Sequence, residues 1–234
     1  MRITHLVPGL GLALALAVAP AASAQNPKPN KPPGGNAPNA SALTLEAKPS
    51  TIVFSGLTTL SGRLTADKAD GVTVRFEQDN TRPYGDGYKP VAGVTATTAN
   101  NGRYSLSIKP LLNTSFRAVA QSSPPTTSPA RVVLVRTLVG IRVSDSTPRR
   151  GSLVRFSGTV FPAHDGGTVL IQKRSSTGSF NTVARKRLTD AGAARSTYSR
   201  RLRIFRDGVY RVKLPGDGDH INGFSRLKTI NVGG

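Results

Sequence analysis

Histidine and aspartate side chains in two turns are the first candidates for chemistry in this sequence. His164 lies in the turn PAHDGG, and His220 lies in the turn GDGDHING together with Asp217 and Asp219. A zinc site normally needs three or four ligands, whereas this chain offers, apart from His5 near the N-terminus, two His in different turns, no Cys and few nearby acids. The DGD segment also lacks the third acid, the following Gly and the distant Glu of a calcium-binding loop. We therefore expect polar turn residues, no metal and no cofactor.

No motif of a common enzyme class is present. The sequence contains no G-x-S-x-G, H-E-x-x-H or Walker loop. The segment SRLK, Ser225 to Lys228, matches S-x-x-K, but that nucleophile and base need a helical turn to share one face. Here the segment falls on a predicted strand, where positions three apart point to opposite sides. Acidic residues are few and lie mostly in turns, so no glycosidase pair is indicated and we predict that the protein is not an enzyme.

The basic stretch RSTYSRRLRIFRDGVYRVK is a candidate binding surface. If strand alternation buries Tyr198, Leu202 and Ile204, it exposes Arg201 and Arg203 on the opposite face of the sheet. A neighbouring strand would add further basic side chains to this exposed plane. The candidate residues for binding a polyanion are Arg185, Lys186, Arg187, Arg200, Arg201, Arg203 and Arg206. Few aromatic residues accompany them for stacking on bases, so we expect no specific recognition of nucleic acid.

Positive charge is concentrated in the C-terminal part of the chain. The protein has 234 residues and a net charge of +20, and residues 137–234 carry 18 basic and six acidic residues, a net charge of +12. Residues 43–136 carry only +5. Such a field favours anionic partners such as acidic wall polymers, extracellular DNA or glycans. The alternative is compositional bias, because 14 of the 18 basic residues are Arg, as a GC-rich genome would produce.

A loop rich in Tyr and Gly is the second candidate for binding. The segment NTRPYGDGYKPV places Asp86 between Tyr84 and Tyr88. The two aromatic rings could stack on a sugar or a peptide while the glycines permit close approach, and loops on sandwich folds often carry binding. The alternative is a long hairpin turn whose tyrosines cover the edge of the sheet.

The N-terminus predicts export. Arg2 precedes the apolar run LVPGLGLALALAVAP, and Ala22 and Ala24 form an A-x-A-like cleavage site. We expect residues 1–24 to be a signal peptide cleaved after Ala24, which makes the mature protein secreted, extracellular or cell-wall-associated, without a membrane anchor. The alternative is an uncleaved anchor, since the uncharged run is nearly as long as the ~20 residues that span a bilayer. Residues 25–42 are rich in Pro and Asn and predict a disordered linker.

The chain after the linker contains an internal repeat. Apolar and polar residues alternate with a period of two, which predicts β-strands. The segment LSGRLTADKADGVTVRFEQ aligns with FSGTVFPAHDGGTVLIQKR at an offset of 96 residues, which pairs Gly62 with Gly158. Further along the chain the offset is 94, and Tyr104 pairs with Tyr198. A nearly constant offset through so many strand residues indicates two homologous modules.

The repeat defines two predicted domains, domain 1 over residues 43–136 and domain 2 over residues 137–234. Each contains about seven short strands separated by turns that are rich in Gly, Asp and Pro. Seven antiparallel strands in about 95 residues are typical of an immunoglobulin-like β-sandwich. The predicted fold class is therefore all-β, with two tandem Ig-like β-sandwich domains whose cores contain no Cys and no Trp.

Domain 2 resembles the Ig-like repeat domains of secreted and surface proteins from high-GC Gram-positive, actinobacterial-type bacteria. The segments that carry the resemblance are VRFSGTV, GGTVLIQKR, GSFNTVARKRL, STYSRRLRIFRDGVYRV and LPGDGDHINGFSR. Domain 1 fits less well, because QSSPPTTSPAR replaces the GD hairpin and DNTRPYGDGYKP is longer than the usual turn. The resemblance implies modules that serve as spacers, adhesive modules or appendages of enzymes, and its motifs are structural.

These observations predict a non-catalytic secreted Ig-like protein that acts in cell-envelope association, adhesion or spacing. One alternative is an electrostatic polyanion-binding module that uses the Arg-rich domain 2. Another is an accessory module of a secreted complex. The sequence leaves the physiological ligand and the oligomeric state open.

Overall fold

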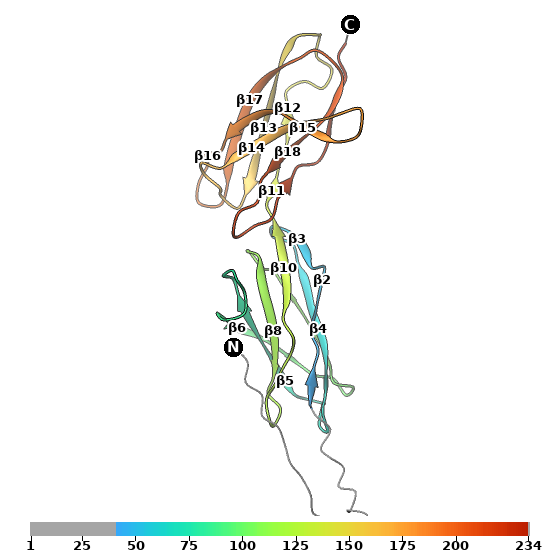
Figure 1. The fold of residues 1–234 in the computed structure, drawn as a ribbon, viewed down its shortest axis with the longest axis vertical. Helices are drawn as coiled ribbons and strands as arrows, with labels where there is room; N and C mark the ends of the chain where they lie inside the picture. Colours follow the sequence, from blue (N-terminus) through green and yellow to red (C-terminus); the bar gives the residue numbers. More distant parts are fainter. Residues whose placement is uncertain (1–40, 234) are drawn as a thin grey trace, which may run out of the picture. The chain divides into compact units, whose positions relative to one another are not determined.

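The computed structural model describes residues 41–233, and every regular element in this range is a β-strand. Within this range no helix is long and apolar enough to cross a membrane. The first strand begins at Ala42, one residue before the predicted start of domain 1. The predicted signal peptide and nearly all of the predicted linker lie outside the described residues. The fold class is all-β and Ig-like, as the alternation predicted (Figure 1).

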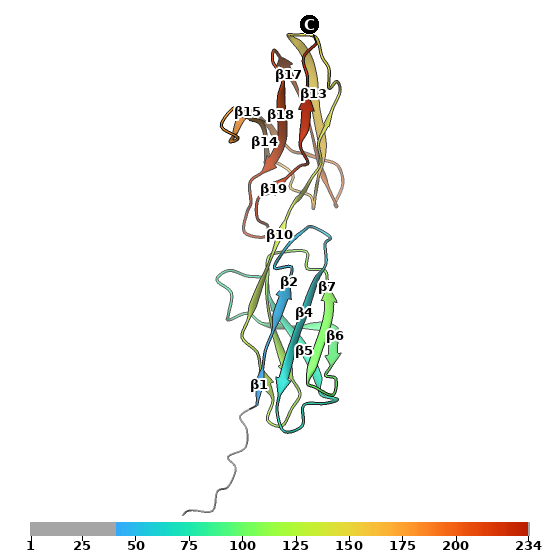
Figure 2. The ribbon, with the colours of Figure 1, turned by 90° about the vertical axis from the view of Figure 1, so that its right-hand side faces the viewer.

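Domain 1 is built from two sheets. In the first sheet, β4 (Thr58–Thr65) is hydrogen-bonded to β1 (Ala42–Leu43), β2 (Glu46–Lys48) and β7 (Arg103–Ile108). The second sheet has the order β3 (Thr51–Val53), β10 (Arg131–Arg136), β8 (Thr114–Ala120), β5 (Thr73–Asp79) and β6 (Lys89–Thr97), and β9 (Thr126–Thr127) pairs with β8. Figure 2 shows β2, β4 and β7 side by side. Strands β3 and β10 pair in parallel, and the other named pairs of this domain are antiparallel.

Domain 2 repeats the two-sheet arrangement. Its β13–β17 sheet has the order β11 (Leu138–Val139), β13 (Ser152–Phe161), β17 (Ser196–Ile204) and β16 (Thr189–Asp190), and β12 (Arg142–Val143) pairs with β13. Its β14–β18 sheet has the order β15 (Phe180–Arg187), β14 (Thr168–Arg174), β18 (Gly208–Leu214) and β19 (Gly223–Phe224), and β20 (Lys228–Ile230) pairs with β18. All these pairs are antiparallel.

Each pair of sheets encloses its own hydrophobic core. Phe76 and Phe116 are fully buried in domain 1, and Phe156 is fully buried in domain 2, where its ring centroid lies 5.2 Å from that of Tyr210. Burying one such aromatic side chain contributes about 2–3 kcal/mol. All the described residues nevertheless fall in one compact unit, so the boundary at residues 136/137 stays a prediction.

The repeated glycines have a packing reason. Tyr198 donates a hydrogen bond to the carbonyl oxygen of Gly140 at 2.7 Å, and its ring passes beside Gly158. Tyr104 of domain 1 likewise donates to the carbonyl oxygen of Thr44 beside Gly62. A Cβ at either glycine would collide with these groups, so the repeat keeps Gly and Tyr together. Burial raises the pKa of both tyrosine hydroxyls.

The β18–β19 loop (residues 215–222) carries contacts to domain 1. The backbone N–H of Ile221 donates to the carbonyl oxygen of Val135 at 2.9 Å, and that of Asn113 donates to the carbonyl oxygen of Asp219 at 2.7 Å. The guanidinium of Arg136 donates to the carbonyl oxygen of Asn222 at 3.1 Å. The loop is therefore held both by its own domain and by the end of domain 1.

Candidate functional site

Four arginines gather on the outer surface of the β13–β17 sheet, and we call Arg142, Arg155, Arg201 and Arg203 the arginine face. Arg155 of β13 lies directly opposite Arg201 of β17 in the strand register. Arg203 follows two positions along β17, and Arg142 of β12 pairs with Ser157, the next outward position of β13. All four side chains are exposed. Alternation places them together, because every second residue of a strand points to the same face.

The alternation predicted for β17 is confirmed by burial. Tyr198 and Ile204 are buried and Leu202 is half-buried, whereas Arg201 and Arg203 are exposed. Arg142 and Arg155 were missed in the sequence, because each is a single arginine in a separate strand and neither belongs to a basic run. Only the register of β12 and β13 brings them beside β17.

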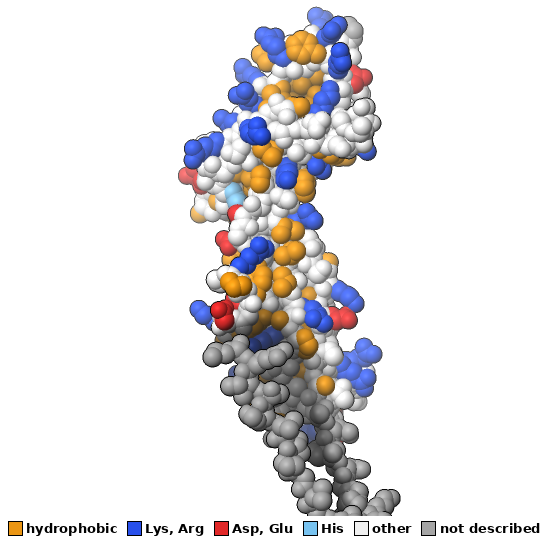
Figure 3. All heavy atoms as spheres, viewed as in Figure 1, with side chains coloured by type: hydrophobic (Ala, Val, Ile, Leu, Met, Phe, Trp, Pro, Cys, Tyr) orange, Lys and Arg blue, Asp and Glu red, His pale blue; other side chains and the backbone are white. Residues whose placement is uncertain are grey.

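The arginine face lacks carboxylate partners. Four ion pairs are present among residues 41–233, and none involves a Lys or Arg of domain 2. Strands β12, β13 and β17 contain no Asp or Glu. Figure 3 shows Lys and Arg side chains spread over the visible face of domain 2, with few acidic side chains between them. Opposed like charges such as Arg155 and Arg201 destabilise a sheet unless an anion lies between them.

An open groove adjoins the arginine face at the end of the sheet towards β11. Its volume is about 940 Å³, and it contains Arg142, Lys186 and Arg226 without any acidic lining residue. Ser157 and Ser199, which face each other across β13 and β17, add hydroxyl donors to it. The groove and the arginine face together offer positive charge and hydrogen-bond donors, which are the groups that bind phosphate or sulfate.

The strand that carries Arg185, Lys186 and Arg187 does not pair with β17, so the expectation of one shared sheet plane was wrong. These residues belong to β15, which pairs with β14 in the opposite sheet. The chain crosses between the sheets at the buried Leu188, and only Thr189 and Asp190 pair with β17. The basic residues therefore do not share one plane. Those of β17 lie on a sheet face, whereas those of β15 lie on an edge strand of the opposite sheet.

The remaining basic candidates are exposed. Arg200 occupies an inward position of β17, opposite the buried Phe156, yet its side chain is exposed. Arg206 is exposed beyond the end of β17, where its carbonyl oxygen accepts a hydrogen bond from Lys173 at 3.3 Å. Arg187 donates to the carbonyl oxygen of Gly166 at 3.0 Å. Whether these groups bind a polyanion stays a prediction.

The tyrosine loop is tied down by contacts within domain 1. The Tyr88 hydroxyl shares a hydrogen bond with Ser115 at 2.7 Å, and Arg117 lies 4.2 Å above its ring. The Tyr84 hydroxyl donates to the carbonyl oxygen of Asn113 at 3.4 Å, while Asp86 is exposed. These contacts favour the structural alternative, in which the tyrosines cover the edge of the sheet.

Asp79, at the end of β5, fixes the backbone of this loop. Its carboxylate accepts hydrogen bonds from the N–H groups of Gly85 at 2.7 Å and Thr81 at 3.0 Å. These bonds favour the charged form and lower the pKa of Asp79, although burial opposes them. A loop held in this way has little freedom to close on a ligand, so the ligand hypothesis for Tyr84, Asp86 and Tyr88 gains no support from the geometry.

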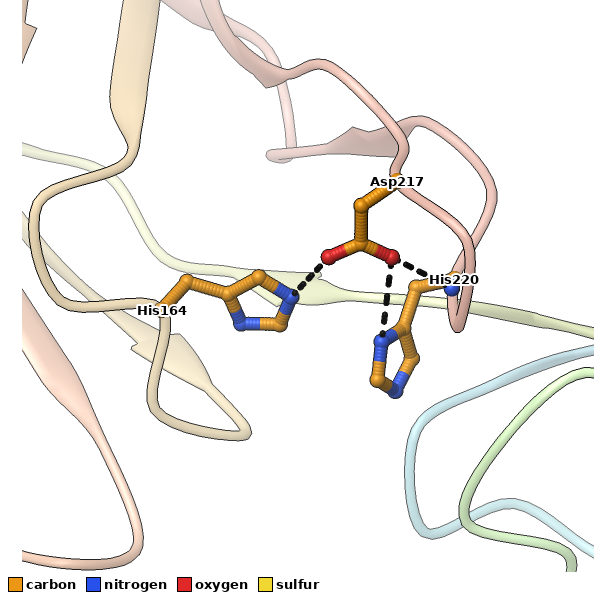
Figure 4. Close-up of side chains that lie close together, drawn as sticks. All are labelled: His164, Asp217 and His220. Carbon is orange, nitrogen blue, oxygen red and sulfur yellow. Dashed lines mark hydrogen bonds and ion pairs between the residues drawn. The ribbon is translucent and has the colours of Figure 1, made fainter.

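His164 and His220 lie side by side, which the sequence analysis did not anticipate. Their ring centroids are 5.1 Å apart, and both rings approach the carboxylate of Asp217 (Figure 4). The premise that two separate turns with few nearby acids cannot form a ligand set was therefore wrong. Burial alone would raise the pKa of Asp217, but the backbone N–H groups of His220 and Asp219 and the two nearby imidazoles outweigh it and lower the pKa.

The comparisons with known proteins add little. No protein-family model and no curated protein matches the sequence. Among solved structures, the chain is similar to the crystal structure of bovine butyrophilin, with a TM-score of 0.40 and 11% identity over 82% of this chain and 99% of that chain. A similarity at this TM-score and identity supports no conclusion about the function of this chain. The fold class, tandem Ig-like β-sandwiches, follows from the sheets and cores themselves, and sandwiches of this class host many unrelated functions.

Proposed function

We propose that this chain is a non-catalytic, exported Ig-like protein that remains at the cell envelope by binding anionic polymers. The observation that carries the proposal is the arginine face, where four exposed guanidinium groups share one sheet surface without a carboxylate partner among the described residues. The resemblance of domain 2 to surface proteins of high-GC Gram-positive bacteria supports the location. A binding role also suits a rigid sandwich with a charged outer surface.

The chemistry of the face favours phosphate or sulfate groups over bases. Guanidinium groups bind these oxyanions through paired N–H donors, and they do so more specifically than ammonium groups. Ser, Thr and Leu occupy the outward positions between the arginines, and the one outward aromatic ring of these strands is Phe161, at the far end of β13. We therefore expect binding of a charged polymer backbone without preference for base sequence.

The test is retention of the full chain on heparin and on phosphate-containing wall polymers at increasing salt. Because bound polymers release counterions, the logarithm of the affinity should fall linearly with the logarithm of the salt concentration. Four phosphate or sulfate contacts correspond to a slope of about −3. Retention that does not change with salt would contradict an electrostatic mechanism. Absence of retention at low salt would mean that the positive charge reflects compositional bias and not polymer binding.

A second candidate function is spacing or adhesion, and the contacts of the β18–β19 loop favour it. Backbone hydrogen bonds from Ile221 and Asn113 join the two domains directly, without an intervening linker. A module with such contacts can hold a binding surface at a fixed distance from its attachment point. This role is compatible with polymer binding, since the arginine face lies on domain 2 alone.

Export is the remaining part of the proposal. The small residues Ala22 and Ala24 support cleavage after Ala24, so the mature chain should begin at Gln25. Mass spectrometry of protein recovered from the culture medium or the cell wall measures this directly. An intact Met1 in the membrane fraction would show instead that the apolar segment is retained as an anchor.

A further inference from the structure

His220 presents a buried nitrogen that has no hydrogen-bond partner. Its side chain is 4% exposed, and its Nε2 lies 3.0 Å from the carbonyl oxygen of Leu111. A carbonyl oxygen can only accept a hydrogen bond, so Nε2 carries the proton in the neutral ring. The Nδ1 atom is then unprotonated and presents a lone pair. The Nδ1 atom makes no hydrogen bond and lies 3.7 Å from Oδ1 of Asp217. An unprotonated Nδ1 and a carboxylate oxygen repel each other, and a proton or a metal ion between them removes the repulsion.

His164 is oriented in the same way. Its Nδ1 lies 2.8 Å from the carbonyl oxygen of Pro162, which fixes the proton on Nδ1 in the neutral ring and leaves Nε2 as a lone pair. That Nε2 points at Oδ2 of Asp217 over 3.2 Å. Metal-binding histidines usually donate their second ring N–H to a carbonyl or carboxylate in this manner, because the hydrogen bond fixes both the tautomer and the orientation of the ring.

The carboxylate of Asp217 is also held in place. Its Oδ1 accepts hydrogen bonds from the backbone N–H groups of Asp219 at 2.9 Å and His220 at 2.7 Å. Its Oδ2 accepts no backbone hydrogen bond and faces His164. The side chain is 48% exposed, so the cluster opens to solvent on the side of Asp217 and an ion can enter there.

We propose that His164 Nε2, His220 Nδ1 and the carboxylate of Asp217 bind one divalent ion of the zinc type. The three ligand atoms lie within 4.8 Å of one another. His164 Nε2 lies 3.2 Å from Oδ2 of Asp217 and His220 Nδ1 lies 3.7 Å from Oδ1, so one carboxylate reaches both imidazoles at distances near the edge of about 3.3 Å expected for tetrahedral zinc. A water molecule would complete the coordination. Two imidazoles among three ligands select against calcium and magnesium, which prefer oxygen.

The ion would join two loops of domain 2. His164 belongs to the loop between β13 and β14, and the other two ligands belong to the β18–β19 loop that contacts domain 1. Zinc would therefore stabilise the junction as well as domain 2. The neighbouring amides of Asn113 and Ile221, which donate across the junction, should exchange their hydrogens more slowly when zinc is bound.

The experiment is a zinc titration of the full chain, prepared without a histidine tag and dialysed against EDTA. Calorimetry should show one zinc ion bound per chain, and saturating zinc should raise the melting temperature by about 5 °C or more. Calcium and magnesium at the same concentration should do neither. The Asp217→Asn variant retains a side-chain oxygen to accept the loop N–H groups, and it should weaken zinc binding at least about 10-fold.

Two further variants complete the test. His164→Gln removes a second ligand and should weaken zinc binding to a similar extent, which keeps the test valid if Asp217→Asn folds poorly. Asp219→Asn is the matched control, because it removes the same charge from the same loop and the Asp219 side chain makes no hydrogen bond or ion pair within residues 41–233. Equal zinc affinity in all variants, or no binding to the native chain, would overturn the proposal and leave the cluster as a histidine–carboxylate ion pair.

Discussion

Replacing Gly158 with Ala should lower the melting temperature of domain 2 by about 10 °C or more. The added Cβ would lie 2.7 Å from the carbonyl carbon of Gly140, closer still to its oxygen, and 2.8 Å from Cε1 of Tyr198. Crowding of this kind in a packed core costs about 1–3 kcal/mol. Displacement of Tyr198 would also break its hydrogen bond to Gly140, which contributes about 0.5–1.5 kcal/mol.

Differential scanning calorimetry of the full chain measures this effect. Gly218→Ala is the matched control, because a Cβ there would meet no atom within 4 Å and its backbone does not need a positive φ. Gly62→Ala should act in the same way on domain 1, where the added Cβ would lie 2.6 Å from the Tyr104 hydroxyl. A Gly158→Ala protein that melts within about 2 °C of the native chain would show that the Tyr198 contact is dispensable.

Replacing all four residues of the arginine face with Ser should weaken heparin binding at least about 100-fold at physiological salt. Each lost phosphate or sulfate contact removes one released counterion, so the salt slope should also become flatter by about three. Stability should hardly change, because substitutions at exposed positions usually alter the free energy of unfolding by less than ~0.5 kcal/mol. Arg155 and Arg201 lie opposite each other and repel, so replacing both removes a repulsion that destabilises the folded state.

The control for this variant removes the same charge from domain 1. Lys68, Arg75, Lys89 and Lys109 are exposed there, and replacing them with Ser lowers the net charge by four without touching the arginine face. This control should lose much less affinity than the variant of the face. Equal losses in both proteins would mean that only the overall charge matters, and a variant that unfolds would mean that the arginines are structural.

Alternation and repeat were enough to predict the long strands and which side chains face the core. Tyr198 and Ile204 are buried where the pattern placed them, and the pairing of Gly62 with Gly158 reflects a real packing constraint. These features are local, because a period of two fixes the face on which each side chain lies. The predicted fold class follows from them.

Strand partners and loop contacts could not be predicted in this way. Alternation continues through β15 and does not reveal that the chain changes sheets at Leu188, so the edge position of Arg185 was missed. His164 lies more than 50 residues from Asp217 and His220, and no periodicity connects two turns. These residues come together only when the two sheets pack into the sandwich. Such tertiary contacts leave no periodic pattern in a single sequence.

The parallel pairing of β3 with β10 has a mechanical consequence. These strands lie near the two ends of domain 1, so a force that pulls the ends apart would slide one strand along the other and strain all their hydrogen bonds at once. In domain 2 the corresponding parallel contact is shorter: one bridge between Arg149 and Gly233, with backbone hydrogen bonds from Asn231 to Ser146 and from Gly233 to Pro148. Resistance to force depends on the rate of unfolding and not on equilibrium stability. If the protein tethers a cell or a polymer under shear flow, we therefore expect domain 2 to unfold first. Its unfolded chain would lengthen and limit the force on domain 1, which would stay folded.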